Sequence, residues 1–229
     1  MATVEHLLVS RPQNDFCISK NQSYTYVWGN GTNELRDDTR LVLNPPSNVN
    51  YLVSGIYTGK SPNYKNLVRS YMAFEIGEEI KDWTRASLSI YIQDHDSANA
   101  GNTVDLTVGI WNMSNGVYDD SVDNWDDYNS GTFVLFENHI VDFSNDWYQQ
   151  SLEFSGNTIK NHQVYVGGHY YIGLCVLISS DIGNNDPDAV IPDDGKLMVQ
   201  YESSEGDDSK KPALYLNYNV SENEMIMIP

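Results

Sequence analysis

The sequence predicts an all-β protein: a two-sheet antiparallel β-sandwich of the jelly-roll type with little or no helix. Apolar and polar residues alternate with a period of two in several segments, as in strands with one buried and one solvated face. Clusters of Gly, Asn, Asp and Pro separate these segments, for example at 44–48 and 183–187, and mark turns. Roughly a dozen short strands joined in this way are typical of sandwiches and jelly rolls.

The alternation is clearest in two segments near the middle of the chain. In 86–92, positions 86, 88, 90 and 92 are apolar, while 87 and 89 are serine. In 103–110, every second residue from Val104 to Ile110 is a branched aliphatic. Ile90 and Val108 are therefore expected in the core, where an introduced charge would be buried without a partner.

The other strand candidates are shorter apolar runs between turn residues. In chain order they are 15–18, 24–28, 39–43, 51–57, 67–76, 132–136, 139–143, 147–154, 163–178, 196–201 and 213–219. The stretch 163–178 is too long for one strand, and Gly167 and Gly168 are expected to divide it. Its second half should be a central strand buried on both faces.

The chain is expected to form one domain. It has 229 residues and shows no internal repeat, linker or abrupt change of composition. We assign 1–220 to a single β-sandwich domain and 221–229 to a C-terminal docking tail. Four large apolar residues stand together in that tail at 225–228, which is unusual for a solvent-exposed end. An extra edge strand on the same domain is the alternative.

The charge balance excludes several classes of partner. Lys and Arg number 13 against 32 Asp and Glu, so the formal net charge is −19. Such a chain repels a phosphate backbone and an anionic lipid surface. No run reaches the roughly 18 apolar residues of a membrane span. The first residues lack a secretory signal's basic start and apolar run, so we expect either a trimmed signal or synthesis in the cytosol.

Motifs of catalysis are not found in the sequence. There is no Gly-x-Ser-x-Gly elbow and no His-Glu-x-x-His, and the glycines at 29 and 31 lack the third glycine of a dinucleotide loop. With 32 acids, a carboxylate pair for glycoside hydrolysis can be imagined almost anywhere, so the acids indicate no site. We therefore expect a protein that is not an enzyme.

The two cysteines, Cys17 and Cys175, both fall in expected strands. A buried free cysteine behaves as a small apolar residue, and we expect this state. A disulfide in an oxidising compartment is the alternative.

Calcium is the cofactor that two acidic loops could take. Ca²⁺ is bound by six to eight oxygens, and the loops 119–127 and 181–188 are dense in Asp and Asn. The expected ligands are Asp119, Asp123 and Asp186. Neither loop has EF-hand spacing, and solvated turn residues are the alternative.

Four aromatic residues are candidates for stacking on a sugar. Trp111 and Tyr91 lie on the polar side of their strand alternation, so their rings are expected to face outward. Trp28 lies beside a Gly-Asn-Gly turn, and Tyr118 lies at the start of an acidic loop. A core or sheet-surface position is the alternative for each of them.

Three blocks of sequence together resemble a known family. The first is Val-Arg-Ser-Tyr-Met-Ala-Phe-Glu-Ile at 68–76 followed by the strand 86–92. The second is the acidic loop around a tryptophan at 117–125, and the third is Tyr-Glu-Ser-Ser-Glu-Gly at 201–206 followed by 212–218. In this order they are similar to the DNRLRE family, whose carbohydrate-binding relatives form module family 96. The insert 44–66 and the chain beyond Tyr218 depart from its pattern.

The resemblance implies a jelly-roll module of cell-surface and secreted proteins that carries no chemistry of its own. It implies that Arg69 and Glu205 correspond to the family's recurrent Arg and Glu, and we expect them to form a structural ion pair inside the sandwich. Trp125 corresponds to the family's loop tryptophan and is expected to pack structurally.

Taken together, these patterns favour a non-catalytic structural or attachment protein on the surface of a large extracellular assembly. A virion decoration, head-fibre or tail component is the favoured kind, with cell-surface glycans as expected ligands. Other protein subunits are expected to bind through the termini. A carbohydrate-binding adhesion module of a secreted or cell-surface protein is the alternative, and a polysaccharide-degrading enzyme is the third class.

Overall fold

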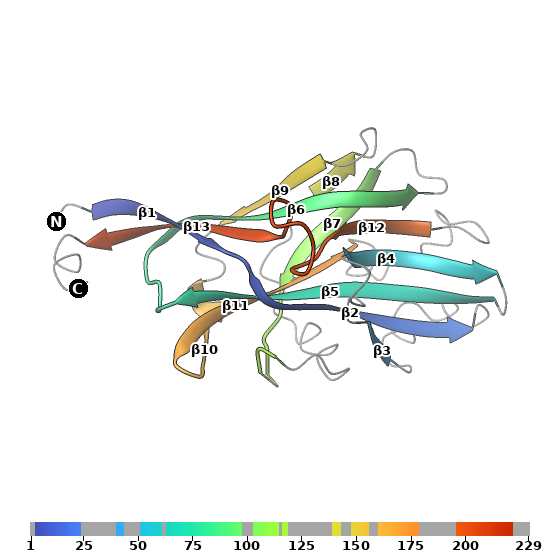
Figure 1. The fold of residues 1–229 in the computed structure, drawn as a ribbon, viewed down its shortest axis with the longest axis horizontal. Helices are drawn as coiled ribbons and strands as arrows, with labels where there is room; N and C mark the ends of the chain where they lie inside the picture. The colour runs from blue at the N-terminus through green and yellow to red at the C-terminus, as the bar shows by residue number, and fades with distance from the viewer. Residues whose placement is uncertain are drawn as a thin grey trace.

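The described chain is all-β and antiparallel, as the sequence predicts (Figure 1). The computed structural model describes residues 3–23, 40–43, 51–60, 63–97, 103–114, 116–118, 139–142, 148–155, 160–178 and 196–221. Within these ranges the helical part is one short 3₁₀ turn, η1 (Lys160–His162). Among the described helical segments, none is long and apolar enough to cross a membrane.

Thirteen strands are described, and they join into one hydrogen-bonded network. In chain order they are β1 (Thr3–Ser10), β2 (Pro12–Ser23), β3 (Arg40–Leu43), β4 (Tyr51–Lys60), β5 (Asn63–Gly77), β6 (Trp83–Ser97), β7 (Thr103–Ile110), β8 (His139–Asp142), β9 (Tyr148–Ser155), β10 (Val164–Val166), β11 (His169–Ile178), β12 (Lys196–Glu202) and β13 (Ala213–Ser221). The expected strands at 24–28 and 132–136 lie outside the described residues.

Two strands of 15 residues, β5 and β6, organise the sheet. One edge of β5 pairs with β2, and its other edge pairs first with β4 and then with β11. In the same way β6 pairs with β9 on one edge, and with β13 and then β12 on the other. One branch is therefore β9-β6-β13-β1 and the other is β2-β5-β11-β7-β8, with β12 and β4 joining them. This arrangement is consistent with a sandwich, while the two-sheet jelly roll stays a prediction.

The core is built from the apolar faces that the alternation predicts. Ile90 and Val108 are 1% and 3% exposed. Three aromatic side chains pack at its centre: the Phe16 and Tyr71 rings stack with centroids 5.2 Å apart, and Trp111 meets both edge-on. Such aromatic pairs add roughly 0.5–1.5 kcal/mol each to the stability that burial provides.

The division of 163–178 is confirmed. β10 and β11 are separated by Gly167 and Gly168, whose φ angles of +62° and +98° favour glycine over any other residue. β11 pairs with β5 on one edge and β7 on the other, and residues 171–178 are all buried. This strand is central in the sheet, as predicted.

The strand β1 is not among the predicted elements. Its residues Leu7, Leu8 and Val9 form an apolar run without clear alternation, and neither face of the strand is fully buried. From β1 the chain passes to the other branch through a single residue, Arg11. The Ser10 hydroxyl donates to the Glu75 carbonyl at 2.6 Å, which ties the crossing point to β5.

Candidate functional site

The outer face of the β6–β13 pair carries the candidate site. In β6 the side chains of Ala86, Leu88 and Ile90 point into the core, so Tyr91 and the serines at 87 and 89 lie on the opposite face. In the register of the two strands, Tyr215 is opposite Ser87 and Ala213 is opposite Ser89. Tyr91 and Tyr215 therefore belong to the same side of the sheet.

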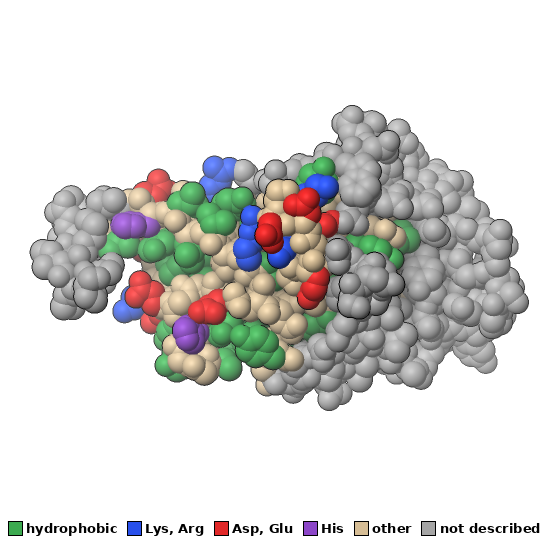
Figure 2. All heavy atoms as spheres, viewed as in Figure 1, with side chains coloured by type: hydrophobic (Ala, Val, Ile, Leu, Met, Phe, Trp, Pro, Cys, Tyr) green, Lys and Arg blue, Asp and Glu red, His purple; other side chains and the backbone are tan. Residues whose placement is uncertain are grey.

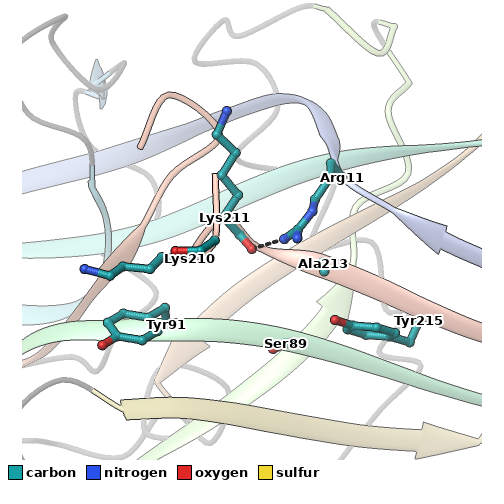
Figure 3. Close-up of a pocket in the computed structure, with 8 residues that line it drawn as sticks. Arg11, Ser89, Tyr91, Lys210, Lys211, Ala213 and Tyr215 are labelled. Carbon is teal, nitrogen blue, oxygen red and sulfur yellow. Dashed lines mark hydrogen bonds between the residues drawn. The ribbon is translucent and has the colours of Figure 1, made fainter. Parts of the chain in front are cut away.

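A loop and one arginine close over this face and form a cleft of about 30 Å³ (Figure 3). The loop is residues 203–212, between β12 and β13. The cleft is lined by Arg11, Ser89, Tyr91, Ser209, Lys210, Lys211, Ala213 and Tyr215. These residues come from the crossing point between β1 and β2, from β6, from the loop and from β13.

Two carboxylates hold the start of the 203–212 loop. The backbone N–H and hydroxyl of Ser204 donate to the two Asp15 oxygens at 2.7 and 2.6 Å. The Asp207 N–H donates to the Glu202 carboxylate at 3.0 Å. Burial raises the pKa of Asp15 to about 6, and the two bonds from Ser204 only partly oppose this rise. Asp15 thus binds the loop from a buried position in which ionisation of its carboxyl group is unfavourable.

Gly206 lets the loop approach the Glu202 side chain. A Cβ atom on Gly206 would lie 2.3 Å from the Glu202 Oε1 and 2.5 Å from its Cγ, well inside van der Waals contact. The Gly206 N–H also donates to the Ser203 carbonyl at 3.2 Å and closes the turn. The glycine is therefore needed for its small size at this position.

Cationic side chains surround the cleft. Arg11 Nη1 donates to the backbone carbonyls of Lys211 and Pro212, the latter at 3.2 Å. The Lys210 ammonium lies 5.0 Å from the centre of the Tyr91 ring, in a cation–π contact. The Lys211 ammonium points away from the cleft and pairs with Asp208 at 2.7 Å (Figure 3). The cationic groups of Arg11 and Lys210 thus lie beside the cleft of an acidic chain.

The cleft has the size and charge to hold a small anionic group. Its volume of about 30 Å³ has room for one or two water-sized groups and not for a sugar ring. The Arg11 guanidinium is a donor suited to carboxylate or sulfate oxygens. The Tyr91 and Tyr215 rings beside it offer the aromatic surface on which the rest of a ligand could lie.

A second polar and aromatic cluster lies where β5 meets the β10–β11 hairpin. His169 Nδ1 lies 2.7 Å from the Glu75 carboxylate. Hydrogen bonding to Tyr118 and burial raise the pKa of Tyr171 to about 12, and Glu75 acts in the same direction. Tyr118 and Tyr165 are 64% and 62% exposed. Figure 2 shows histidine, acidic and hydrophobic-class side chains together over this hairpin.

The predicted sugar-stacking residues have different outcomes. Tyr91 is on the outer face, as expected, where it is half-buried and lines the cleft, and Tyr118 is exposed. The prediction for Trp111 is wrong, because its side chain is fully buried. β7 ends at Ile110, so the strand alternation no longer applies at 111, and the ring turns in onto Phe16 and Tyr71. Trp28 lies outside the described residues.

The calcium prediction is not decided by the structure. Asp119, Asp123 and Asp186 all lie outside the described residues, as does Trp125. Within the described part of the chain, no group of three or more His, Cys, Asp or Glu side chains could hold a metal ion.

The expected pairing of Arg69 with Glu205 inside the sandwich is wrong, because only Arg69 is buried there. Arg69 is fully buried in β5, as expected, but Glu205 is exposed in the 203–212 loop. β12 ends at Glu202 and the chain then turns outward; Glu202 itself is 5% exposed because the 203–212 loop covers its carboxylate. The predicted strand 196–201 ends one residue before β12 does, so Glu205 falls beyond the strand, in the loop.

Cys17 and Cys175 are free and buried, as predicted. The Cys17 sulfur accepts a bond from the Val53 N–H at 3.2 Å and lies 3.4 Å from the Ser70 hydroxyl. Burial raises the pKa of Cys17 to about 11, so this thiol is unreactive near neutral pH.

Sequence reasoning missed Arg11, Lys210 and Tyr215 as site residues. Arg11 is separated from Lys211 by 200 positions, and no local pattern links the two. Compared with protein-family models and with curated proteins, the chain matches none.

Proposed function

We propose that this chain is a non-catalytic structural or attachment protein on the surface of a large extracellular assembly, and that it binds glycans. A virion decoration, head-fibre or tail component is the favoured kind. One observation carries the glycan-binding part: Arg11, Lys210 and Tyr91 meet at one cleft on the outer face of the sheet. The assembly part is supported by the sequence, through its apolar terminal tail and its lack of catalytic motifs.

The cleft favours a saccharide that bears an anionic substituent. A carboxylate or sulfate would enter beside the Arg11 guanidinium, while the apolar face of the sugar ring would lie on Tyr91 or Tyr215. The net charge of −19 repels an anionic glycan at long range, so its binding depends on the local cations Arg11 and Lys210 at the cleft.

A binding role fits the chemistry of the cleft better than hydrolysis does. Its described lining contains hydroxyls, cations and two aromatic rings, but no Asp, Glu or His. General acid–base cleavage of a glycosidic bond uses two opposed carboxyl groups. The lining supports a site that holds a saccharide without breaking it.

The alternative function is a carbohydrate-binding adhesion module of a secreted or cell-surface protein. The resemblance of three sequence blocks to the DNRLRE family and module family 96 supports this alternative. Both functions share the glycan site and differ in what the chain is attached to.

A glycan-array measurement tests the proposal. Residues 1–229 are applied with calcium and again with chelator, beside Tyr91→Ala, Arg11→Gln and the control Tyr165→Ala. We expect the wild-type chain to bind anionic glycans. Tyr91→Ala and Arg11→Gln should lose this binding, and the control Tyr165→Ala should keep it. Uronate and sulfated glycans on the array separate the two kinds of anion. No binding in either condition would overturn the proposal, and binding lost with chelator would assign the site to the acidic loops instead.

A further inference from the structure

The strand β1 has an open edge. It pairs with β13 over all eight of its residues, from Thr3 opposite Ser221 to Ser10 opposite Leu214. Among the described strands it stands at the end of the sheet order and has no partner on its other side. We call this pair of strands the β1–β13 ribbon; it projects at one end of the molecule (Figure 1). An open edge offers a row of backbone donors and acceptors to a further strand.

The ribbon is depleted of charge. Asp, Glu, Lys and Arg make up 20% of the chain, yet Glu5 is the one such residue in β1 and β13 has none. β1 also lacks the Lys and Pro residues that protect many edge strands from pairing. Two copies with a charge of −19 each repel, and β1 adds to this repulsion only through Glu5.

Apolar side chains lie on both faces of β1. Leu7 and Val9 are 61% and 45% exposed on one face, and Leu8 is half-buried on the other. The His6 Nε2 atom on that second face is shielded from solvent and has no hydrogen-bond partner in the described part of the chain. A strand covered on both sides within a sheet has this character, whereas a protected edge strand carries polar residues.

We propose that β1 pairs antiparallel with β1 of a second copy of this chain, across a two-fold axis perpendicular to the sheet. An isologous contact of this kind is the commonest in homodimers. Eight residues a side make a short interface, below the roughly 1,200 Å² of a standard one, so the dimer is weak and depends on concentration.

The geometry of this pairing places both clefts on one side of the dimer. Val9 is directly opposite Tyr215, so Leu7 and Val9 share the outer face with the cleft. A two-fold axis perpendicular to a sheet keeps each face on its own side. If the proposed glycan function holds, on which this step rests, two clefts then face one surface and bind it with avidity.

Sedimentation equilibrium of residues 1–229 over a dilution series tests the pairing. We expect the mass to rise from 25.9 kDa toward twice that value with concentration. Leu7→Glu adds a like charge to each strand and should need about tenfold more protein to dimerise. Tyr165→Glu adds the same negative charge at a 62% exposed residue on β10, away from β1, and should dimerise like the wild type. A wild-type chain that stays monomeric, or two variants with equal effects, would overturn the proposal.

A second measurement does not depend on the stability of the charged variant. Leu7→Cys, which lies within one residue of the two-fold axis when all eight residues pair, should give a covalent dimer with a short bis-maleimide, and Tyr165→Cys should not; the native thiols are buried. Dimerisation that appears only after residues 222–229 are removed would assign the edge to that tail and overturn the proposal. A monomer that binds glycans contradicts the pairing alone, and a dimer that binds none contradicts the glycan function alone.

Discussion

The 203–212 loop covers the outer face of the sheet, and β1 is a strand at the end of the same sheet. The two segments are held in place by different interactions. The loop is fixed by charged side chains: Asp15 and Glu202 bind its first half, and Arg11 binds its last residues. β1 is held by backbone pairing with β13 and is almost free of charge. Charged side chains thus provide hydrogen-bond partners for the irregular backbone of the loop, while the backbone groups of a regular strand pair with those of its neighbour.

The largest expected effect comes from the core that lies beneath the loop. Ile90→Asp would bury an unpaired carboxylate at a position 1% exposed and should unfold the domain, a loss of more than about 4 kcal/mol. Val9→Asp, on the ribbon at 45% exposure, should cost about 1 kcal/mol or less. Urea titration followed by tryptophan fluorescence compares the two. A fully stable Ile90→Asp variant would show that the assigned strand register is wrong.

The loop should also make stability depend on pH. The folded-state pKa of Asp15 is raised from 3.8 to about 6, so its favourable contribution is full below pH 4 and is lost as the pH rises through 6. The loss is at most about 3 kcal/mol, because one pKa unit corresponds to 1.36 kcal/mol.

Asp15→Asn isolates this effect. The amide can still accept from the Ser204 N–H and carries no charge, so the variant should lose the slope between pH 4 and 6 and match or exceed wild type at pH 7.5. Thermal unfolding at several pH values measures it, with Glu5→Gln on the ribbon as the control. An unchanged slope in Asp15→Asn would mean that another group titrates.

A smaller effect is expected for Gly206→Ala. The added Cβ would overlap the Glu202 carboxylate, and the loop must shift at a cost of about 1–3 kcal/mol. The loss in the free energy of glycan binding should exceed the loss in the free energy of unfolding, because Lys210 and Lys211 belong to the displaced loop. Binding and melting curves on the same preparation separate the two effects, and unchanged binding would show that the loop does not shape the cleft.

The sequence predicts those parts of the fold in which local pattern and burial agree. β6, β7 and β11 follow from alternation and from paired glycines, because each residue's environment is set by its own strand. Trp111 fails because it lies one residue past the end of β7, where the pattern stops. β1 is missed because apolar residues lie on both of its faces, so its sequence has no alternation to detect.

The candidate cleft could be predicted only in part. Tyr91 follows from the alternation of β6, but Arg11 and Lys210 reach it through tertiary contacts between distant segments. The burial of Glu202 depends on the 203–212 loop that covers it and on the space that Gly206 leaves. None of these determinants has a local signature in the chain.

The pairing of β1 with β13 joins the first described strand to the last. During synthesis at about 5–20 residues per second, β1 waits roughly 10–40 s before its partner leaves the ribosome. Contacts between such distant segments also form late, because closing the long intervening loop is entropically costly. β1 is therefore without its partner strand for this time, and its charge-poor segment with Leu7, Leu8 and Val9 is open to contact with neighbouring nascent chains.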